Sequence, residues 1–302
     1  MKNLTLKQLR YFQALAEHRH FGRAAAACSI SQPALSMQIK DLEADAGAPL
    51  VERGARQVHL TALGKAFADR ARDILAAVDE LQDLTRAAQG RLSGRLRLGV
   101  IPTVAPYLLP RMVASVSASH PGLELQVRET VTPRLLEGLG DGNLDAAVMA
   151  LPVVQTWLAA APILAEHFVL LRPASDRGAP VPAPEKLRQM RLLLLEEGHC
   201  FRDQALAFCN FNTALPREGF DASSLSTLVQ MVAAGIGVTL LPEMAIPVET
   251  RSATVDVAHF APPEPRRTVG LVWRRKSPLG KELGRLAKGL SRDFGGGVEL
   301  SP

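Results

Sequence analysis

The chain has 302 residues, of which 47% are hydrophobic and 22% are charged, a composition typical of a globular protein rather than a disordered one. No apolar run reaches the roughly 18 residues that a membrane span needs, and the first residues lack the apolar core of a secretory signal. Three cysteines do not suit a disulfide scaffold, so we expect about two domains in a cytoplasmic protein without a membrane partner.

The positive charge is unevenly distributed along the chain. Residues 1–97 contain 15 Lys and Arg against 10 Asp and Glu, whereas residues 98–302 contain 20 of each. The whole net charge of +5 therefore lies in the first third. A basic N-terminal module before a neutral body is typical of a polyanion-binding unit joined to a unit that controls it.

Residues 1–60 predict a winged helix-turn-helix. Helical spacing of apolar residues indicates helices over 6–18 and 21–28, and Ser31 is expected to cap a third helix that ends near Asp45. The alternating segment 51–60 predicts a hairpin wing, and a third helix of this size fits the DNA major groove. Each exposed residue could by itself be plain surface, but the pattern and the charge together favour DNA contact. The candidate DNA-contacting residues are Gln32, Pro33, Ser36, Met37 and Lys40 on the third helix, with Arg53 and Arg56 on the wing.

The sequence of this module resembles a known family. The run Ser-Gln-Pro-Ala-Leu-Ser at 31–36, with Leu-Arg-Tyr-Phe at 9–12 and Leu-Glu at 42–43, is similar to the DNA-binding domain of LysR-type transcriptional regulators. The resemblance implies double-stranded operator DNA as a partner, RNA polymerase as a further candidate partner, and an assembly that is commonly a homotetramer.

Residues 61–94 predict a long linker helix followed by a hinge. Thr61 is expected to cap the helix, which reaches about Gln89, and the stretch 90–95 is rich in Gly, Ser and Arg. Apolar or small residues recur in alternating steps of four and three, which indicates a heptad seam and a homodimer. Packing of the seam on its own domain is the alternative. The seam consists of Phe67, Ala71, Ile74, Val78, Leu81, Thr85 and Ala88.

Residues 95–302 alternate predicted strands and helices, which indicates an α/β domain with a mostly parallel sheet. Thr103 and Thr132 each follow a predicted strand, so we expect both to face the crevice beyond the strand ends, with capping of the next helix as the alternative. In the LysR resemblance this region is a two-lobed regulatory domain, similar to periplasmic binding proteins, with a second lobe at about 165–268.

Cys200 and Cys209 form a second candidate site. Cys200 is predicted near the N-terminus of a helix over 203–209, where the helix dipole, His199 and Arg202 favour a thiolate and two neighbouring glutamates oppose it. Nine residues of helix span about 13 Å, whereas a disulfide needs Cα atoms within about 7 Å. A bond between the two cysteines therefore requires this segment to unwind. The alternative is two unrelated buried cysteines.

The surroundings of these cysteines resemble the OxyR branch of the LysR-type family, the hydrogen peroxide sensors. The similar segments are 198–204 with Cys209, 101–110, 232–242 and 264–268. The resemblance implies that Cys200 is the peroxidatic cysteine, that Cys209 is the resolving cysteine, and that glutaredoxin or thioredoxin reduces their disulfide. Supporting roles in the peroxide site are implied for Thr103, Thr132, His199, Arg202 and Asp203. In one departure, this chain has Gly219 where members of the branch carry His.

Two other functions compete with peroxide sensing. A LysR-type regulator with a small-molecule inducer in the interlobe cleft would have non-redox cysteines, which stay reduced at low peroxide. A thiol peroxidase would leave the DNA-binding module without a function, so we expect a regulator and not an enzyme. The His and Cys residues show no metal-ligand spacing, and we expect neither a metal nor a cofactor.

Overall fold

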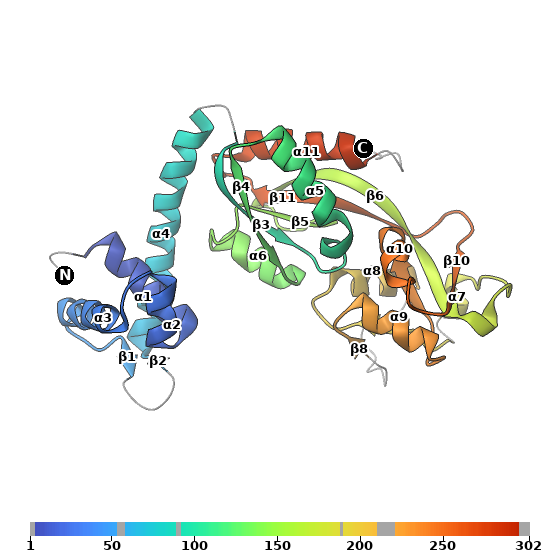
Figure 1. Cartoon of the computed structure of the whole chain (residues 1–302), viewed down its shortest axis with the longest axis horizontal. Coiled ribbons are helices and arrows are strands. Elements are labelled where there is room, and N and C mark those ends of the chain that lie inside the picture. Colours follow the sequence, from blue (N-terminus) through green and yellow to red (C-terminus); the bar gives the residue numbers. More distant parts are fainter. Residues whose placement is uncertain (1–3, 53–57, 89–91, 188–189, 210–220, 296–302) are drawn as a thin grey trace. The chain divides into compact units, whose positions relative to one another are not determined.

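The structure is a computed structural model that describes residues 4–52, 58–88, 92–187, 190–209 and 221–295. The chain divides into two compact units, Met1–Thr85 and Arg86–Pro302 (Figure 1). The helices are α1 (Leu6–His18), α2 (Phe21–Ala27), α3 (Gln32–Ala46), α4 (Ala62–Ala88), α5 (Ala105–Ser119), α6 (Thr132–Gly140), α7 (Pro184–Leu187), α8 (Cys200–Phe208), α9 (Leu225–Ala233), α10 (Ile246–Glu249) and α11 (Gly280–Phe294), with 3₁₀ turns η1 (Ala174–Asp176) and η2 (Glu243–Ala245). The strands are β1 (Val51–Glu52), β2 (His59–Leu60), β3 (Gly94–Val100), β4 (Leu123–Glu129), β5 (Ala146–Leu151), β6 (Leu158–Pro173), β7 (Leu194–Leu195), β8 (Asp221–Ala222), β9 (Thr239–Pro242), β10 (Val255–His259) and β11 (Arg266–Arg274).

The first unit contains the predicted helix-turn-helix. The Ser31 hydroxyl accepts a hydrogen bond from the Ala34 amide at 3.4 Å and caps α3 as expected. Leu35, Ile39 and Leu42 are buried, so the apolar stripe of α3 faces the core and its polar side faces solvent. The strands β1 and β2 pair antiparallel and form the base of the wing. The wing tip, with Arg53 and Arg56, lies outside the described residues.

The long helix α4 begins as predicted. The Thr61 hydroxyl accepts a hydrogen bond from the Gly64 amide at 2.9 Å. Early in the heptad seam, Phe67 packs edge-to-face on Phe12 in the core of its own unit, with ring centroids 5.3 Å apart. Farther along the seam, Ile74 and Leu81 are 44% and 63% exposed. The start of the seam therefore packs in the core of its own unit. Farther along the helix, the seam leaves apolar side chains exposed in this chain.

The second unit is built on a mixed sheet. Its seven strands lie in the order β10-β6-β11-β5-β3-β4, with β9 also paired to β6. The strand β3 is parallel to β4 and β5, but every pair that involves β6 or β11 is antiparallel. The prediction of a mostly parallel sheet is therefore wrong. The cause is that β6 and β11 are long neighbouring strands that run in opposite directions.

Two hydrophobic cores define the two lobes of this unit. One core lies between β3, β5, α5, α6 and α11, and the other surrounds α8 and α9 between Phe168 and Phe260. The strand β6 extends from the first lobe into the second (Figure 1). Each lobe therefore has its own core, and the continuous strands β6 and β11 carry groups that both lobes contact.

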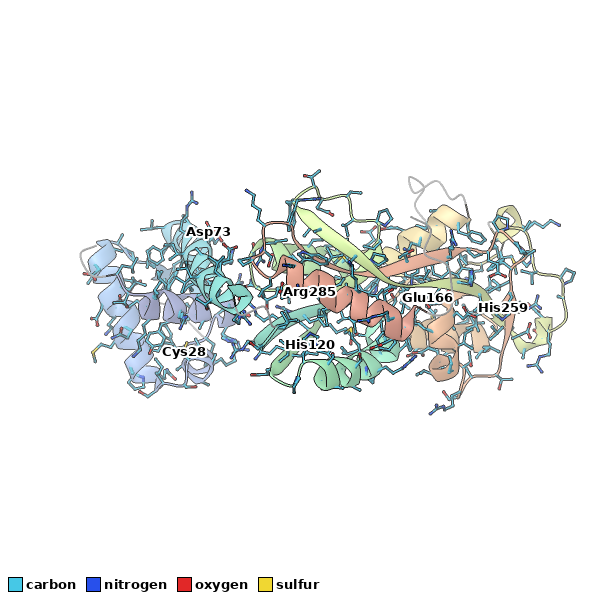
Figure 2. The ribbon with its side chains drawn as sticks, turned by 90° about the horizontal axis from the view of Figure 1, so that it is seen from above. Cys28, Asp73, His120, Glu166, His259 and Arg285 are labelled. Atoms are coloured by element: carbon cyan, nitrogen blue, oxygen red, sulfur yellow. The ribbon has the colours of Figure 1, made fainter. Side chains whose placement is uncertain are left out.

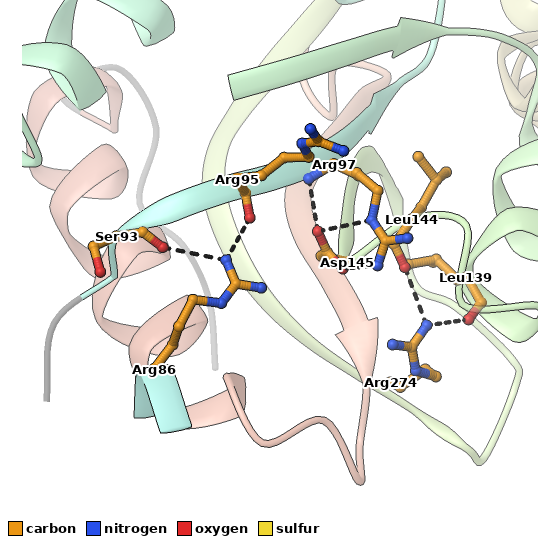
Figure 3. Close-up of polar contacts among 8 residues, drawn as sticks. All are labelled: Arg86, Ser93, Arg95, Arg97, Leu139, Leu144, Asp145 and Arg274. Carbon is orange, nitrogen blue, oxygen red and sulfur yellow. Dashed lines mark hydrogen bonds and ion pairs between the residues drawn. The ribbon is translucent and has the colours of Figure 1, made fainter. Parts of the chain in front are cut away.

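Buried polar contacts fix the strands of the first lobe (Figure 3). The carboxylate of Asp145, which is 2% exposed, accepts hydrogen bonds from the Arg97 amide and from its guanidinium Nη2, both at 2.7 Å. The Arg274 guanidinium donates to the carbonyl oxygens of Leu139 and Leu144 at 2.6 and 3.1 Å. These bonds link β3 to the start of β5 and the end of β11 to α6 and the loop that follows it. Thr103 follows β3 after two residues.

Among the described residues, no helix is both long and apolar enough to cross a membrane. The same part of the chain contains no group of three or more His, Cys, Asp or Glu residues that could hold a metal ion.

Candidate functional site

The predicted DNA-contacting residues of α3 lie on one outward side of the helix. Gln32, Pro33, Met37 and Lys40 are exposed, and Ser36 is half-buried. This arrangement presents small polar side chains at the start of the helix and a cation one turn or more farther along. Both are suited to a groove of DNA lined by base edges and phosphates.

Glu43 supports this surface, although sequence reasoning had quoted it only as part of the family resemblance. Its Oε1 atom accepts hydrogen bonds from the amides of Leu50 and Val51 at 2.8 and 3.1 Å. The side chain therefore ties the end of α3 to the first strand of the wing. The signal that could have found it is a glutamate at the end of the recognition helix, just before a predicted strand.

The two candidate redox cysteines lie at opposite ends of α8. The helix begins at Cys200, three residues earlier than predicted, and Cys209 follows its last residue. Cys200 is half-buried against the core of the first lobe, whereas Cys209 is fully buried in the core of the second lobe. All three cysteines of the chain are thiols, and the helix separates these two by about 13 Å along its axis.

Thr103 and Thr132 do not cap the helices that follow them. The helices α5 and α6 begin after Val104 and Val131, and neither start has a side-chain cap. Thr103 is 2% exposed and its hydroxyl accepts a hydrogen bond from Arg267 at 2.8 Å. The buried Thr132 hydroxyl finds no hydrogen-bond partner among the described residues. Of the two roles weighed for these threonines, capping is therefore excluded.

A glycine brings the start of α8 against the start of α6. Gly198 has φ +94°, a left-handed backbone conformation that favours glycine. A Cβ atom on Gly198 would lie 3.5 Å from Val131 and 3.8 Å from Pro133. The residues on either side of Thr132 therefore contact the turn that leads into His199 and Cys200, so the two predicted groups of site residues meet in space.

His199 contributes a buried imidazole to this site. Its residue is 5% exposed, and burial lowers the pKa of the imidazole, while Glu196 at 4.0 Å acts in the opposite direction. The Nδ1 atom is buried and unpartnered within the described part of the chain. A buried polar atom of this kind normally bonds to protein, water or a ligand.

His199 and Thr103 line one small cavity between the lobes, with a volume of about 110 Å³. Across this cavity the Tyr107 hydroxyl donates a hydrogen bond to Glu249 at 2.6 Å, which links α5 in the first lobe to α10 in the second. Burial raises the pKa of Tyr107, and the hydrogen bond to Glu249 acts in the same direction.

Arg202 and Asp203 are not among the residues that line this cavity. The Arg202 guanidinium donates to the Leu195 carbonyl oxygen and to the Asp221 carboxylate, each at 2.7 Å, and so ties the first turn of α8 to β7 and β8. Asp203 is exposed. Support of a peroxide site by these two residues stays a prediction.

Arg267 is the main group that sequence reasoning did not assign to the site. Its side chain is fully buried and donates from Nε to Glu166 at 2.7 Å, from Nη1 to the Thr103 hydroxyl at 2.8 Å, and from Nη2 to the Thr103 carbonyl oxygen at 2.9 Å. The guanidinium also lies 5.6 Å from the ring of Phe201, the neighbour of Cys200. Gln204 on α8 was missed as well, and its Oε1 atom is buried and unpartnered among the described residues.

A winged helix-turn-helix, a long helix and a two-lobed α/β unit together define the LysR class of regulators, and family models agree. The bacterial regulatory helix-turn-helix of the LysR family matches residues 6–65, and the LysR substrate binding domain matches residues 89–293. The chain belongs to the LysR family of transcriptional regulators.

Relatives of the chain within that family include OxyR proteins and hydrogen peroxide-inducible genes activators. The probable hydrogen peroxide-inducible genes activator of Streptomyces viridosporus is 45% identical over 95% of this chain and 93% of its own length. Full-length OxyR from Pseudomonas aeruginosa, with a cysteine replaced by aspartate, has a TM-score of 0.72 at 35% identity over 95% of both chains. A Corynebacterium glutamicum OxyR cysteine-to-serine mutant with bound hydrogen peroxide has a TM-score of 0.64 at 37% identity, over 96% of this chain and 92% of that one.

Proposed function

We propose that the protein is a DNA-binding transcriptional regulator that senses hydrogen peroxide through Cys200 and Cys209. The observation that carries this proposal is a half-buried thiol at the start of α8, which directly follows His199 with its buried Nδ1 atom, unpartnered in the described chain. The start of α6 packs against the same turn and holds the Thr132 hydroxyl, which is also buried and unpartnered there. Such atoms suit a small ligand that both donates and accepts hydrogen bonds. The likeness to a peroxide-bound OxyR structure supports this assignment.

The chemistry of the response follows the cysteine oxidation series. The Cys200 thiolate attacks one oxygen of hydrogen peroxide, the O–O bond breaks, and the second oxygen leaves as hydroxide and takes a proton from solvent. The Cys209 thiol then displaces water from the Cys200 sulfenic acid and forms the disulfide. Two electrons from a dithiol reductant such as glutaredoxin or thioredoxin restore both thiols. A slow reduction step limits the protein to one oxidation per signal and distinguishes a sensor from a thiol peroxidase, so we expect stoichiometric oxidation rather than rapid turnover.

The disulfide changes the fold because α8 holds the two sulfurs apart. Bridging requires part of the helix to unwind, and Phe201, Ala205 and Leu206 then leave the core of the second lobe. Uncovering one large apolar side chain costs about 1.5–3 kcal/mol, so the segment must refold against new partners. We infer that this changes how subunits pack in a homotetramer built on α4-mediated dimers. The positions of two α3 helices on operator DNA change with it, as does the access of RNA polymerase.

The volume of the interlobe cavity argues against a metabolite inducer. The cavity of about 110 Å³ is smaller than the roughly 300 Å³ at which ligand pockets for drug-sized molecules begin. It has room for a few small polar molecules.

The proposal is tested by titrating the full-length protein with peroxide and mapping its thiols by mass spectrometry. We expect a bond between Cys200 and Cys209 at near-stoichiometric peroxide, with Cys28 still alkylatable. Reduced Cys200 and Cys209 under these conditions, together with a metabolite bound between the lobes, would establish the inducer-binding alternative instead.

Replacements on α3 separate the two kinds of DNA contact. Lys40→Ala should weaken binding to all DNA sequences alike and reduce the slope of log affinity against log salt by about one. Gln32→Ala should weaken operator binding alone, by about 1–3 kcal/mol. Lys281→Ala, an exposed lysine of the second unit, is the control. Fluorescence anisotropy over a salt series measures both effects, and equal losses for Lys40→Ala and Lys281→Ala would contradict the assignment of α3.

The buried imidazole of His199 makes stability depend on pH. The pKa of His199 is lowered in the folded state, so the unfolded chain takes up a proton first as the pH falls below its ordinary pKa of about 6.5. The unfolding free energy is thus expected to decrease with acidification below that pH, until the folded pKa is reached. Denaturation curves of the His199→Gln variant should lack this part of the decrease, while the exposed His259→Gln control keeps it. Parallel curves for the wild type and His199→Gln would show that the imidazole contributes nothing.

A further inference from the structure

Glu166 is a buried carboxylate with no part in the oxidation steps of Cys200 and Cys209 described above. It lies on β6, between the first-lobe residues His120 and Arg285 and the second-lobe residue His259 (Figure 2). The residue is 5% exposed, and its two oxygens have different partners. Oε1 accepts from Arg267 Nε at 2.7 Å, and Oε2 accepts from the Met244 amide at 3.1 Å.

These bonds determine the direction of the hydrogen bond at Thr103. A guanidinium has donors only, so the Thr103 oxygen must be the acceptor in its 2.8 Å bond with Arg267. The Nη2 atom of Arg267 donates to the Thr103 carbonyl oxygen at 2.9 Å. The hydroxyl hydrogen of Thr103 is therefore not used in either bond. It can be donated toward the cavity that Thr103 shares with His199.

We propose that Glu166 is a positioning residue for the reaction of Cys200 with peroxide, an inference that rests on the proposed function. Glu166 holds the Arg267 guanidinium against Thr103, and Arg267 in turn commits Thr103 to donate its hydrogen to peroxide. In the attack by Cys200, this hydrogen bond stabilises the oxygen on which negative charge develops as the O–O bond breaks. Glu166 itself touches neither the thiol nor the oxidant.

The site requires a carboxylate at this position. Both partners of Glu166 are N–H donors, and a carboxylate accepts from both. A glutamine has one accepting oxygen and one donating amide group, so it would place a donor against either Arg267 or Met244. Glu166→Gln therefore keeps the shape of the side chain and loses one of its two bonds.

A second pair in the same unit provides a matched control. Arg172 on β6 donates from Nε to Asp256 on β10 at 2.7 Å, and the two side chains are 6% and 15% exposed. In each of the two pairs, the arginine lies directly opposite its carboxylate on the neighbouring strand. Asp256→Asn thus removes the negative charge from a comparable pair whose arginine is not bonded to Thr103.

The experiment measures the second-order rate of Cys200 oxidation by hydrogen peroxide in the full-length protein, with thermal unfolding recorded for each variant. Glu166→Gln should slow the oxidation about tenfold or more, because one misdirected donor at a transition state costs at least that much. Asp256→Asn should react at a rate close to that of the wild type. In a Thr103→Val background, Glu166→Gln should cause no further slowing, because the hydroxyl through which it acts is gone.

Other outcomes overturn the proposal. Equal rates for Glu166→Gln and Asp256→Asn, or a full additional loss in the Thr103→Val background, would show that Glu166 does not act through Thr103. A Glu166→Gln variant that fails to fold would assign the residue to stability alone. If wild-type Cys200 does not react with peroxide, the proposed function itself fails. If wild-type Cys200 reacts and Glu166→Gln reacts at the same rate, only the role of Glu166 fails.

Discussion

A Cys200→Ser variant is expected to lose the peroxide response completely while it keeps its affinity for DNA. Serine has no accessible anion at neutral pH and cannot be oxidised to a sulfenic acid, so neither the first step nor the disulfide can occur. Cys209→Ser should behave differently, because Cys200 is still oxidised and its sulfenic acid persists without a resolving thiol. Operator binding with and without peroxide, combined with a sulfenic-acid-specific label, distinguishes the three proteins.

The control for this prediction is the third cysteine. Cys28 lies in the first unit, is half-buried, and has a pKa raised by burial. A raised pKa leaves less thiolate at neutral pH, so Cys28→Ser should respond to peroxide as the wild type does. A Cys200→Ser protein that still changes its DNA binding with peroxide would show that another group is the sensor.

The second large effect is expected for Arg267→Leu. This replacement leaves the Glu166 carboxylate buried without its cation, and breaking a buried pair in this way typically costs about 3–5 kcal/mol of unfolding free energy. The exposed pair of Arg134 and Glu137 is the matched comparison, with side chains 69% and 56% exposed at 2.9 Å. Arg134→Leu should cost less than about 1 kcal/mol, because surface pairs are weak. Denaturant unfolding of the two variants measures the contrast.

A double replacement separates the buried charge from other causes. In Arg267→Leu combined with Glu166→Leu no charge is left uncompensated, so part of the lost stability should return. Similar losses for Arg267→Leu and Arg134→Leu would contradict the assignment of Arg267 and Glu166 as a buried ion pair. Without recovery in the double variant, the loss would have to come from packing.

The local signals in the sequence predicted the first unit well. Ser31 caps α3, Leu35 and Ile39 face the core, and Thr61 begins α4, because caps and helical periodicity act over a few residues. The start of α8 differs from the prediction because the left-handed backbone of Gly198 allows the helix to begin directly at Cys200. The full length of β6 could not be predicted, because much of it lacks the alternation of apolar and polar residues that is typical of a strand.

Long-range pairing explains what could not be predicted at the site. Arg267 meets Glu166 across 101 residues of sequence and Thr103 across 164 residues, and no spacing rule connects such positions. The strand β11 begins with two arginines, a pattern that indicates an exposed position, and only the fold shows that the second of them is buried. Thr103 and Thr132 were identified by their places after strands, but the unpartnered hydroxyl of Thr132 could be seen only in the structure.

The intact helix α8 keeps Cys200 and Cys209 apart and must unwind for them to bond. Hydrogen exchange of the amides between these cysteines, measured in the reduced protein and again after one equivalent of peroxide, follows this unwinding. We expect slow exchange in the reduced protein and fast exchange, or a new pattern of protection, once the disulfide has formed. Unchanged protection across α8 in a protein shown to contain the bond would contradict it.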